Sequence, residues 1–217
     1  MAKQKLQKFS EYKSFPNTFD FAFELKGFWA EKVFKNKNPI VLELACGKGE
    51  YSVNLAQLHP QKNFIGIDIK SNRMWRGAKT AFEKKIANVA FMRASIEKIS
   101  DLFDEAEITE IWITFPDPYP KDKHEKYRLT HVDFLRMYKK ILEPNGFIHF
   151  KTDDDGLFDF TLQVLTNLKI KPVEIITNVH EDELANEHLK NITTHYEKLF
   201  IGKGKKIKYC RFSLENL

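Results

Sequence analysis

Cysteine and long apolar runs are both scarce in this sequence. Among the 217 residues there are two cysteines, Cys46 and Cys210, and they form no CxxC pair. A disulfide scaffold and a cysteine zinc site are therefore excluded, which is typical of a reduced compartment. The seven histidines show no metal-ligand spacing either, so no metal is expected. No apolar segment approaches the ~20 residues of a membrane helix.

The first residues also lack the apolar core of a signal peptide. Met1 to Ser14 is basic and polar, so we expect a cytoplasmic protein with no membrane partner. What the chain does contain is 42% hydrophobic residues and 19 Phe, enough for a globular domain. The net charge of +5 gathers near residues 3–13, 121–128 and 203–208. Such clusters are compatible with a nucleic acid or another acidic surface.

Short apolar segments alternate with amphipathic ones along most of the chain. Seven segments read as strands, 40–45, 63–69, 89–94, 110–115, 147–152, 173–179 and 207–214, and the segments between the first six read as helices. This alternation predicts an α/β fold: a doubly wound, mainly parallel, seven-stranded sheet with helices on both faces. Ahead of it, residues 1–17 are predicted to be a mobile basic arm and 19–34 a helix. Neither a monomer nor a homodimer is favoured.

A glycine turn follows the first predicted strand, in the segment Glu43 to Gly49. Gly47 and Gly49 would let the backbone approach a ligand, and Asp68 ends the second strand, where a carboxylate can accept from ribose hydroxyls. Ser52 replaces the third glycine of a dinucleotide motif, and Glu43 would repel a pyrophosphate. S-adenosylmethionine, with a cationic end and a ribose, therefore fits best. A dinucleotide or a structural glycine turn are the alternatives.

A second motif, Phe115-Pro116-Asp117-Pro118-Tyr119, ends the fourth predicted strand. Prolines on both sides stiffen the loop and push Asp117 toward extended geometry. Asp117 is thus a carboxylate at the sheet edge where ligands bind. It suits either an amino-group methyltransferase or attack by an unprotonated ring nitrogen such as guanine N7. In the second case Asp117 would accept from the guanine edge and offset the new positive charge.

Basic and aromatic residues interleave directly after this motif. Lys121, Lys123, Lys126 and Arg128 alternate with Tyr119 and Tyr127, a pattern typical of a loop that holds phosphates and stacks on an unpaired base. Further on, Lys151 and Asp153 end the fifth predicted strand. From spacing alone, Thr193 or Thr194 would simply cap the helix that follows, with Glu197 in its first turn.

Taken together, these motifs resemble the bacterial tRNA (guanine-N7)-methyltransferase family over roughly residues 38–212. The marks are the Phe-Pro-Asp-Pro…Lys…His…Lys…Arg-Leu loop, Ile-His-Phe-Lys-Thr-Asp at 148–153, and Thr-x-Tyr-Glu at 194–197. The resemblance implies a class I methyltransferase domain over 38–217, preceded by the arm and helix of 1–37. It implies methyl transfer from S-adenosylmethionine to N7 of a guanosine in the tRNA variable loop.

The resemblance also implies roles for individual residues. The methyl donor would contact Glu43, Gly47, Gly49, Asp68, Ser95 and Asp117, and Asp117 would be the catalytic carboxylate. The tRNA would contact Lys121, Asp153 and the run Thr194, His195, Tyr196 and Glu197. The chain departs from the common family pattern at Asp68 (commonly Glu), Ser95 (commonly Asp or Asn), Tyr119 (often Trp) and in the loop basic run at Asp122 and Tyr127.

Two other functions remain as alternatives at this point. An N6-adenine or N4-cytosine methyltransferase would share the fold and the donor, but the loop around Asp117 lacks two consecutive prolines. A non-catalytic RNA-binding protein with a vestigial donor pocket would not need both donor carboxylates. A dehydrogenase is disfavoured by Ser52 and by the absence of a proton relay.

Overall fold

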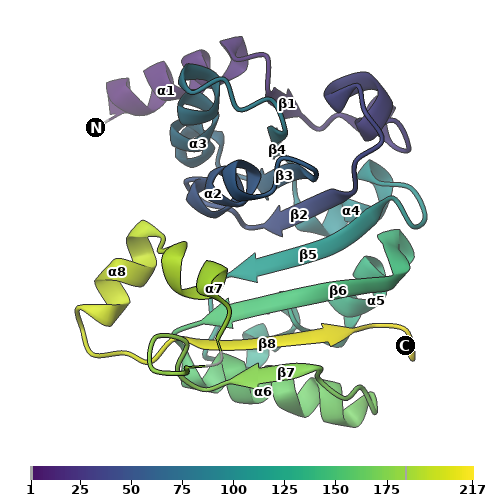
Figure 1. Ribbon diagram of the computed structural model, residues 1–217, viewed down its shortest axis with the longest axis vertical. Helices are drawn as coiled ribbons and strands as arrows, with labels where there is room; N and C mark the ends of the chain where they lie inside the picture. Colours follow the sequence, from purple (N-terminus) through teal and green to yellow (C-terminus); the bar gives the residue numbers. More distant parts are fainter. Residues whose placement is uncertain (1, 184) are drawn as a thin grey trace.

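One mixed sheet forms the centre of the molecule (Figure 1). The computed structural model describes residues 2–183 and 185–217. Within these ranges the sheet has eight strands in the order β1-β4-β3-β2-β5-β6-β8-β7. Strand β8 runs antiparallel to β6 and β7, and all other neighbours are parallel. The strands are β1 (Thr18–Asp20), β2 (Ile40–Leu44), β3 (Asn63–Asp68), β4 (Val89–Arg93), β5 (Ile108–Thr114), β6 (Leu142–Thr152), β7 (Glu174–Ile176) and β8 (Lys208–Ser213).

Helices cover both faces of this sheet. They are α1 (Ala2–Ser14), α2 (Glu50–Leu58), α3 (Ser71–Glu83), α4 (Ile99–Leu102), α5 (Val132–Ile141), α6 (Asp155–Asn167), α7 (Glu187–Asn191) and α8 (His195–Ile201). One apolar core joins the sheet to α4, α5 and α6, and a second joins it to α1, α2, α3 and α7. Within residues 2–183 and 185–217, every helix is too short or too polar to cross a lipid bilayer.

The central strands are buried on both faces, as expected of a parallel sheet between two helical layers. In β2, Ile40, Leu42 and Leu44 enter the first core and Val41 enters the second. Because side chains alternate along a strand, Glu43 lies on the same face as Val41. A carboxylate in an otherwise apolar strand is therefore directed toward the α2 side of the sheet.

The strand order places a ligand crevice at one edge. Strand β2 pairs with β3 on one side and with β5 on the other, so successive connections diverge at this point. In open α/β sheets the crevice at such a switch point binds the ligand, outside the carboxyl ends of the strands. Here those ends belong to β2, β3, β4, β5 and β6. The predicted fold class is confirmed.

Two predictions for the N-terminal region were wrong. The helix predicted over 19–34 is instead the edge strand β1, which pairs with β4, then a 3-10 turn (Phe23–Leu25) and a π-helical segment (Trp29–Phe34). This accounts for the eighth strand. Phe21 and Gly27 adopt left-handed backbone angles, φ 46° and 76°, which a continuous helix excludes.

The segment 2–14 is not a mobile arm but helix α1, which packs on α3. Tyr12 is 1% exposed, and its hydroxyl donates to the Phe91 carbonyl at 3.0 Å. Trp75 Nε1 donates to the Glu11 carboxylate at 2.8 Å. The many basic residues obscured this helix in the sequence, because among the described side chains of α1 Tyr12 alone is buried. Met1 lies outside the described residues.

Candidate active site

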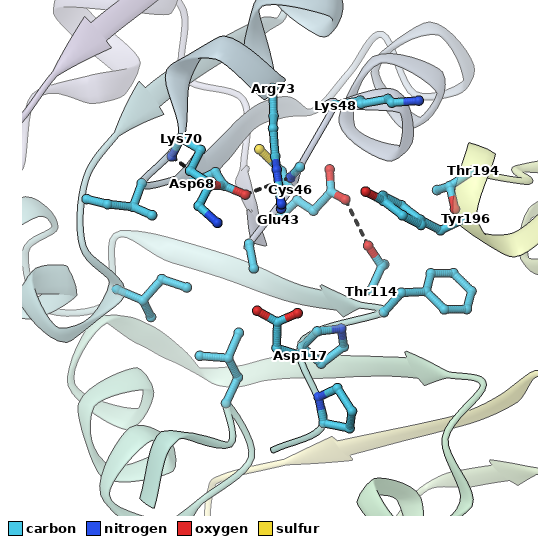
Figure 2. Close-up of a pocket in the computed structure, with 18 of the residues that line it drawn as sticks. Glu43, Cys46, Lys48, Asp68, Lys70, Arg73, Thr114, Asp117, Thr194 and Tyr196 are labelled. Carbon is cyan, nitrogen blue, oxygen red and sulfur yellow. Dashed lines mark hydrogen bonds between the residues drawn. The ribbon is translucent and has the colours of Figure 1, made fainter. Parts of the chain in front are cut away.

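A cleft of about 680 Å³ opens at the carboxyl edge of the sheet (Figure 2). Its walls come from the ends of β2, β3 and β4, the loop after β5, and the start of α8. Of the twelve donor and tRNA contacts that the resemblance implies, those that line it are Glu43, Gly47, Asp68, Ser95, Asp117, Asp153, Thr194 and Tyr196. The remaining four, Gly49, Lys121, His195 and Glu197, are not among its lining residues.

The glycine turn is pressed tightly against the sheet. Gly49 has φ 68°, and a Cβ there would lie 2.2 Å from the ring of Phe91. Gly77 of α3 meets the same ring and the Lys48 carbonyl, so a side chain there would push the turn outward. By contrast, a Cβ on Gly47 would meet little, because this residue faces the cleft. Gly49 thus serves packing, while Gly47 presents its backbone to the cleft.

Glu43 is the most deeply held carboxylate in the cleft. It is 4% exposed and accepts from the backbone N–H of Ser52 at 2.9 Å and from the Thr114 hydroxyl at 2.9 Å. The Ser52 hydroxyl donates to it as well. Burial outweighs these three donors and raises the pKa of Glu43 to about 7. Ser52, which stands where a dinucleotide motif has its third glycine, therefore fixes the Glu43 carboxylate through two hydrogen bonds.

Asp68 joins the end of β3 to the glycine turn. One carboxylate oxygen accepts from the Gly47 N–H at 3.0 Å, and the other accepts from the Lys70 N–H at 2.8 Å (Figure 2). The carboxylate is thereby fixed in orientation, with part of its acceptor capacity still available to a ligand.

Beyond Asp68, the cleft wall becomes apolar. Ile69 is 50% exposed and lines the cleft together with Ile96 and Ala94. This chain buries most of its apolar residues, so an exposed isoleucine inside a concave site is notable. Such an apolar surface can pack against a flat ring of a ligand. Ser95 lies in this wall and donates its hydroxyl hydrogen bond to the carboxylate of Glu97.

Asp117 lies on the opposite wall from Glu43 and Asp68, on the loop after β5 (Figure 2). The loop holds two left-handed non-glycine residues, Phe115 at φ 50° and Tyr119 at φ 44°. Such conformations cost energy and persist only where neighbours enforce them. Here the Phe115 N–H donates to the Lys151 carbonyl at 2.8 Å. The Asp117 side chain itself is exposed to the cleft, where its carboxylate can accept hydrogen bonds from a ligand.

The basic loop divides into two kinds of residue. Lys121, Lys123 and Lys126 are exposed, as predicted for phosphate contacts. Arg128 is 9% exposed, donates to the Tyr119 carbonyl at 3.1 and 3.3 Å, and lies 4.4 Å from the ring of Phe160. The guanidinium holds the left-handed Tyr119 in place, so this burial does not favour the phosphate role predicted for Arg128, which stays a prediction.

The C-terminal wall of the cleft is the start of α8. Thr194 caps this helix, accepting from the Glu197 N–H at 3.1 Å, and Tyr196 extends into the cleft (Figure 2). His195 is exposed, and its backbone N–H donates to the Glu50 carboxylate at 2.8 Å. Asp153 forms an ion pair with Lys205, and both line the cleft.

Glu197 is turned away from the cleft. Its side chain is 0% exposed and lies 2.8 Å from the ammonium of Lys151, which is also 0% exposed. The motif pointed to these two residues, but their pairing was missed, as were the contacts of Ser52 and Thr114 with Glu43. Each pairing crosses strands or helices that are distant in the sequence, so spacing carries no signal of it.

The side chains that line the cleft suit an organic cation with a ribose better than a metal ion. In the described part of the chain, no group of three or more His, Cys, Asp or Glu side chains is arranged to hold a metal ion. The cleft instead offers a buried carboxylate (Glu43), an oriented one (Asp68), and an apolar wall (Ile69 and Ile96). These match an ammonium, a ribose and a purine ring in turn.

The solved structures that resemble this one include two rRNA methyltransferases. The 16S rRNA methyltransferase KamB matches with a TM-score of 0.63 at 13% identity, covering 84% of this chain and 91% of its own. A 16S rRNA (adenine(1408)-N(1))-methyltransferase from Catenulisporales acidiphilia, solved with the cosubstrate SAM, matches with a TM-score of 0.56 at 14% identity, over 85% and 89%. At such identities the likeness establishes the fold alone.

Sequence comparison is more specific. Residues 37–210 match a family model described as a putative methyltransferase. The tRNA (guanine-N(7)-)-methyltransferase of Christiangramia forsetii is 46% identical over 99% of both chains. That of Bacteroides fragilis is 43% identical over 99% of this chain and 87% of its own. The chain belongs to the tRNA (guanine-N(7)-)-methyltransferase family.

Proposed function

We propose that this protein transfers a methyl group from S-adenosylmethionine to N7 of a guanosine in the variable loop of tRNA. Two held carboxylates, Glu43 and Asp68, face a third carboxylate, Asp117, across one cleft at the switch point of the sheet. This arrangement carries the proposal, and membership of the family supports it. Because tRNA is the proposed methyl acceptor, we also propose a cytoplasmic location. Residues 38–217 carry the reaction, and 2–37 brace the sheet.

The donor side follows from the cleft. Glu43 would hold the ammonium of the methionine end, with the backbone at Gly47 beside it, while Gly49 keeps the turn in place. Asp68 would accept from the ribose hydroxyls, and the wall at Ile69 and Ser95 would hold the adenine. When bound, S-adenosylmethionine supplies an electrophilic methyl group on a sulfonium. The chain's own task is to present an acceptor atom in line with it.

The acceptor side needs no general base. Guanine N7 carries a lone pair and no proton, so nothing has to be removed before attack. Asp117 would accept from the N1–H and N2–H edge of guanine and thereby orient the ring. The same carboxylate would offset the positive charge that the imidazole part of the base gains on methylation.

The rim of the cleft suits a single-stranded or flipped nucleotide. Tyr119, His124 and Tyr127 form an aromatic cluster with ring centroids 5.7 to 6.4 Å apart, and both tyrosines line the cleft. Guanosine must leave its tertiary pairing for N7 to be reached, and a stacking surface would stabilise the extruded base. We assign tRNA contacts to Lys121, Asp153, Thr194, His195 and Tyr196.

The direct test is to identify the methylated nucleoside. The protein would be incubated with S-adenosylmethionine labelled in the methyl group and with unmodified tRNA, followed by digestion and chromatography. Label in 7-methylguanosine is expected. Label in N6-methyladenosine or N4-methylcytidine would refute the N7 assignment while keeping the donor. Donor binding without any labelled nucleoside would point to a non-catalytic RNA-binding protein.

Donor affinity is expected to depend on the protonation of Glu43. Its pKa near 7 lies above that of an exposed carboxyl group, so the uncharged form dominates below pH 7. Because only the carboxylate attracts an ammonium, the donor should bind about eightfold more weakly at pH 6 than at pH 7.5. Calorimetry in two buffers of different ionisation enthalpy would measure both the affinity and the proton released.

The matched variant for this prediction is Glu43→Gln. The amide does not titrate, so affinity should be lower throughout and flat across this pH range. A pH dependence that persists in Glu43→Gln would assign it to another group. The sign for stability is opposite to that for binding. Since the folded pKa lies above the unfolded value, the contribution of Glu43 to stability falls as the pH rises from about 4.5 toward 7.

Lys121 is expected to contact phosphate rather than base. Lys121→Ala should weaken tRNA binding and make the slope of log Kd against log salt shallower by about 0.7 to 0.9, the effect of one released counterion. Filter binding over a range of salt concentrations measures this slope. Lys140→Ala, an exposed lysine on α5, is the charge-matched control. Equal slopes in the Lys121 variant and the wild type would remove the phosphate contact.

A further inference from the structure

A fully buried ion pair lies behind the acceptor wall of the cleft. Lys151 at the end of β6 and Glu197 on α8 are both 0% exposed, with the ammonium 2.8 and 3.0 Å from the two carboxylate oxygens. The ammonium also donates to the Leu189 carbonyl at 2.7 Å. His180, which is partly exposed, lies 2.9 Å from the same carboxylate through Nε2.

These contacts connect four segments that are distant in the chain. They join the end of β6, the connection after β7, helix α7 and helix α8. Burial lowers the pKa of Lys151, and the adjacent carboxylate of Glu197 opposes that shift. Two charges removed from water are tolerated only as a pair, so each holds the other in place. The ring of Tyr51, 5.5 Å from the ammonium, covers the pair from α2.

Lys151 also supports the other side of the acceptor site. Its carbonyl accepts from the N–H of Phe115 at 2.8 Å, the left-handed residue two positions before Asp117. The ring of Phe115 in turn lies 5.9 Å from that of Phe200 on α8. One residue therefore contacts the Asp117 loop through its backbone and α8 through its side chain.

We infer that Lys151, Glu197 and His180 form a positioning network that aligns Thr194 and Tyr196 on α8 with Asp117 for the tRNA acceptor. Glu197 contributes through Lys151 and not by touching tRNA, although its motif resembles a substrate contact. Among the described residues, the hydrogen bonds and ion pairs of the network involve neither Glu43 nor Asp68, so we expect it to act mainly on the acceptor. This inference rests on the proposed function.

Single substitutions should damage acceptor use selectively. Glu197→Gln and Lys151→Met each leave one charge buried without its partner. We expect a fall of about 10- to 100-fold in kcat/KM for tRNA, mainly through KM, because displaced binding groups lose alignment. The Kd for S-adenosylmethionine should stay within about twofold of the wild type. The control Lys140→Met removes the same charge from the exposed surface of α5 and should change neither quantity.

The double variant Lys151→Met/Glu197→Leu separates positioning from direct contact. With both charges replaced by apolar side chains, neither is left alone, and such replacements are often tolerated. We expect kcat/KM to recover to within about tenfold of the wild type, above both single variants. A double variant as poor as the product of the singles would mean that Glu197 touches tRNA, and would overturn the inference.

Two further measurements keep the inference testable if the double variant does not fold. His180→Leu removes the partly exposed partner and should raise KM for tRNA about threefold to tenfold, with kcat nearly unchanged. An unchanged KM would exclude His180 from the network. Amide hydrogen exchange of residues 195–201, measured without tRNA, should accelerate in Glu197→Gln and His180→Leu but not in Lys140→Met. Unchanged exchange in both would overturn the positioning role.

The exchange measurement also distinguishes the two proposals. If the wild-type protein fails to form 7-methylguanosine, the proposed function fails. The effect of the network on α8 is still read directly from exchange, because that experiment contains no RNA.

Discussion

Replacing Asp117 by alanine is expected to lower turnover on tRNA by about 10²- to 10³-fold, the range measured when one electrostatic stabiliser is removed from an active site. The carboxylate lies on a loop held by two prolines, two left-handed residues and the Arg128 guanidinium. Its position is therefore set before the acceptor arrives. Single-turnover methylation with saturating donor would measure the loss in the chemical step.

Donor binding provides the control for Asp117→Ala. The side chain is exposed to the cleft and forms no hydrogen bond or ion pair within the described residues, so the Kd for S-adenosylmethionine should rise only modestly. Asp117→Asn keeps a carbonyl acceptor but loses the charge, and should fall between alanine and the wild type. Asp159→Ala, an exposed carboxylate on α6, should behave as the wild type. Turnover equal to the wild type in Asp117→Ala would remove this residue from the mechanism.

Replacing Asp68 by alanine is expected to weaken donor binding by about 10²-fold. A hydrogen bond to a charged group contributes about 1.5–3 kcal/mol, and every 1.4 kcal/mol is a tenfold change in affinity. In addition, Gly47 and Lys70 would lose the acceptor of their N–H groups. The turn that meets the donor would loosen together with the ribose contact. Calorimetric titration with S-adenosylhomocysteine measures the combined effect.

An aspartate outside the cleft provides the control that separates a specific loss of donor affinity from a general effect of removing a carboxylate. Asp101→Ala removes an exposed aspartate of α4, 60% exposed at its side chain, and should leave donor affinity unchanged. Asp68→Glu is the conservative variant, since the longer side chain can still reach a ribose. It should bind the donor more tightly than Asp68→Ala does. Wild-type affinity in Asp68→Ala would place the ribose elsewhere in the cleft.

Most of the candidate cleft could be predicted because its residues follow strands in the sequence. Glu43 with its glycine turn, Asp68, Ser95, Asp117 and Asp153 each come at or just after the carboxyl end of a parallel strand. In a doubly wound sheet those ends share one edge. The order of residue types along the chain is then enough to bring them together. The N-terminal region was not predicted correctly. Basic residues obscured the helix around Tyr12, and an aromatic residue such as Phe19 packs well in either a helix or a strand.

The sequence by itself determined the fold class, the position of the cleft and the residue types that face it, since strand ends and glycine turns are local features. Only the tertiary structure decided which charged residues face the cleft and which face inward. Arg128 and Glu197 read as surface groups, yet each is buried against a partner, the Tyr119 carbonyl and the Lys151 ammonium. Burial of a charge depends on a partner from a distant segment, and local sequence carries no record of that partner.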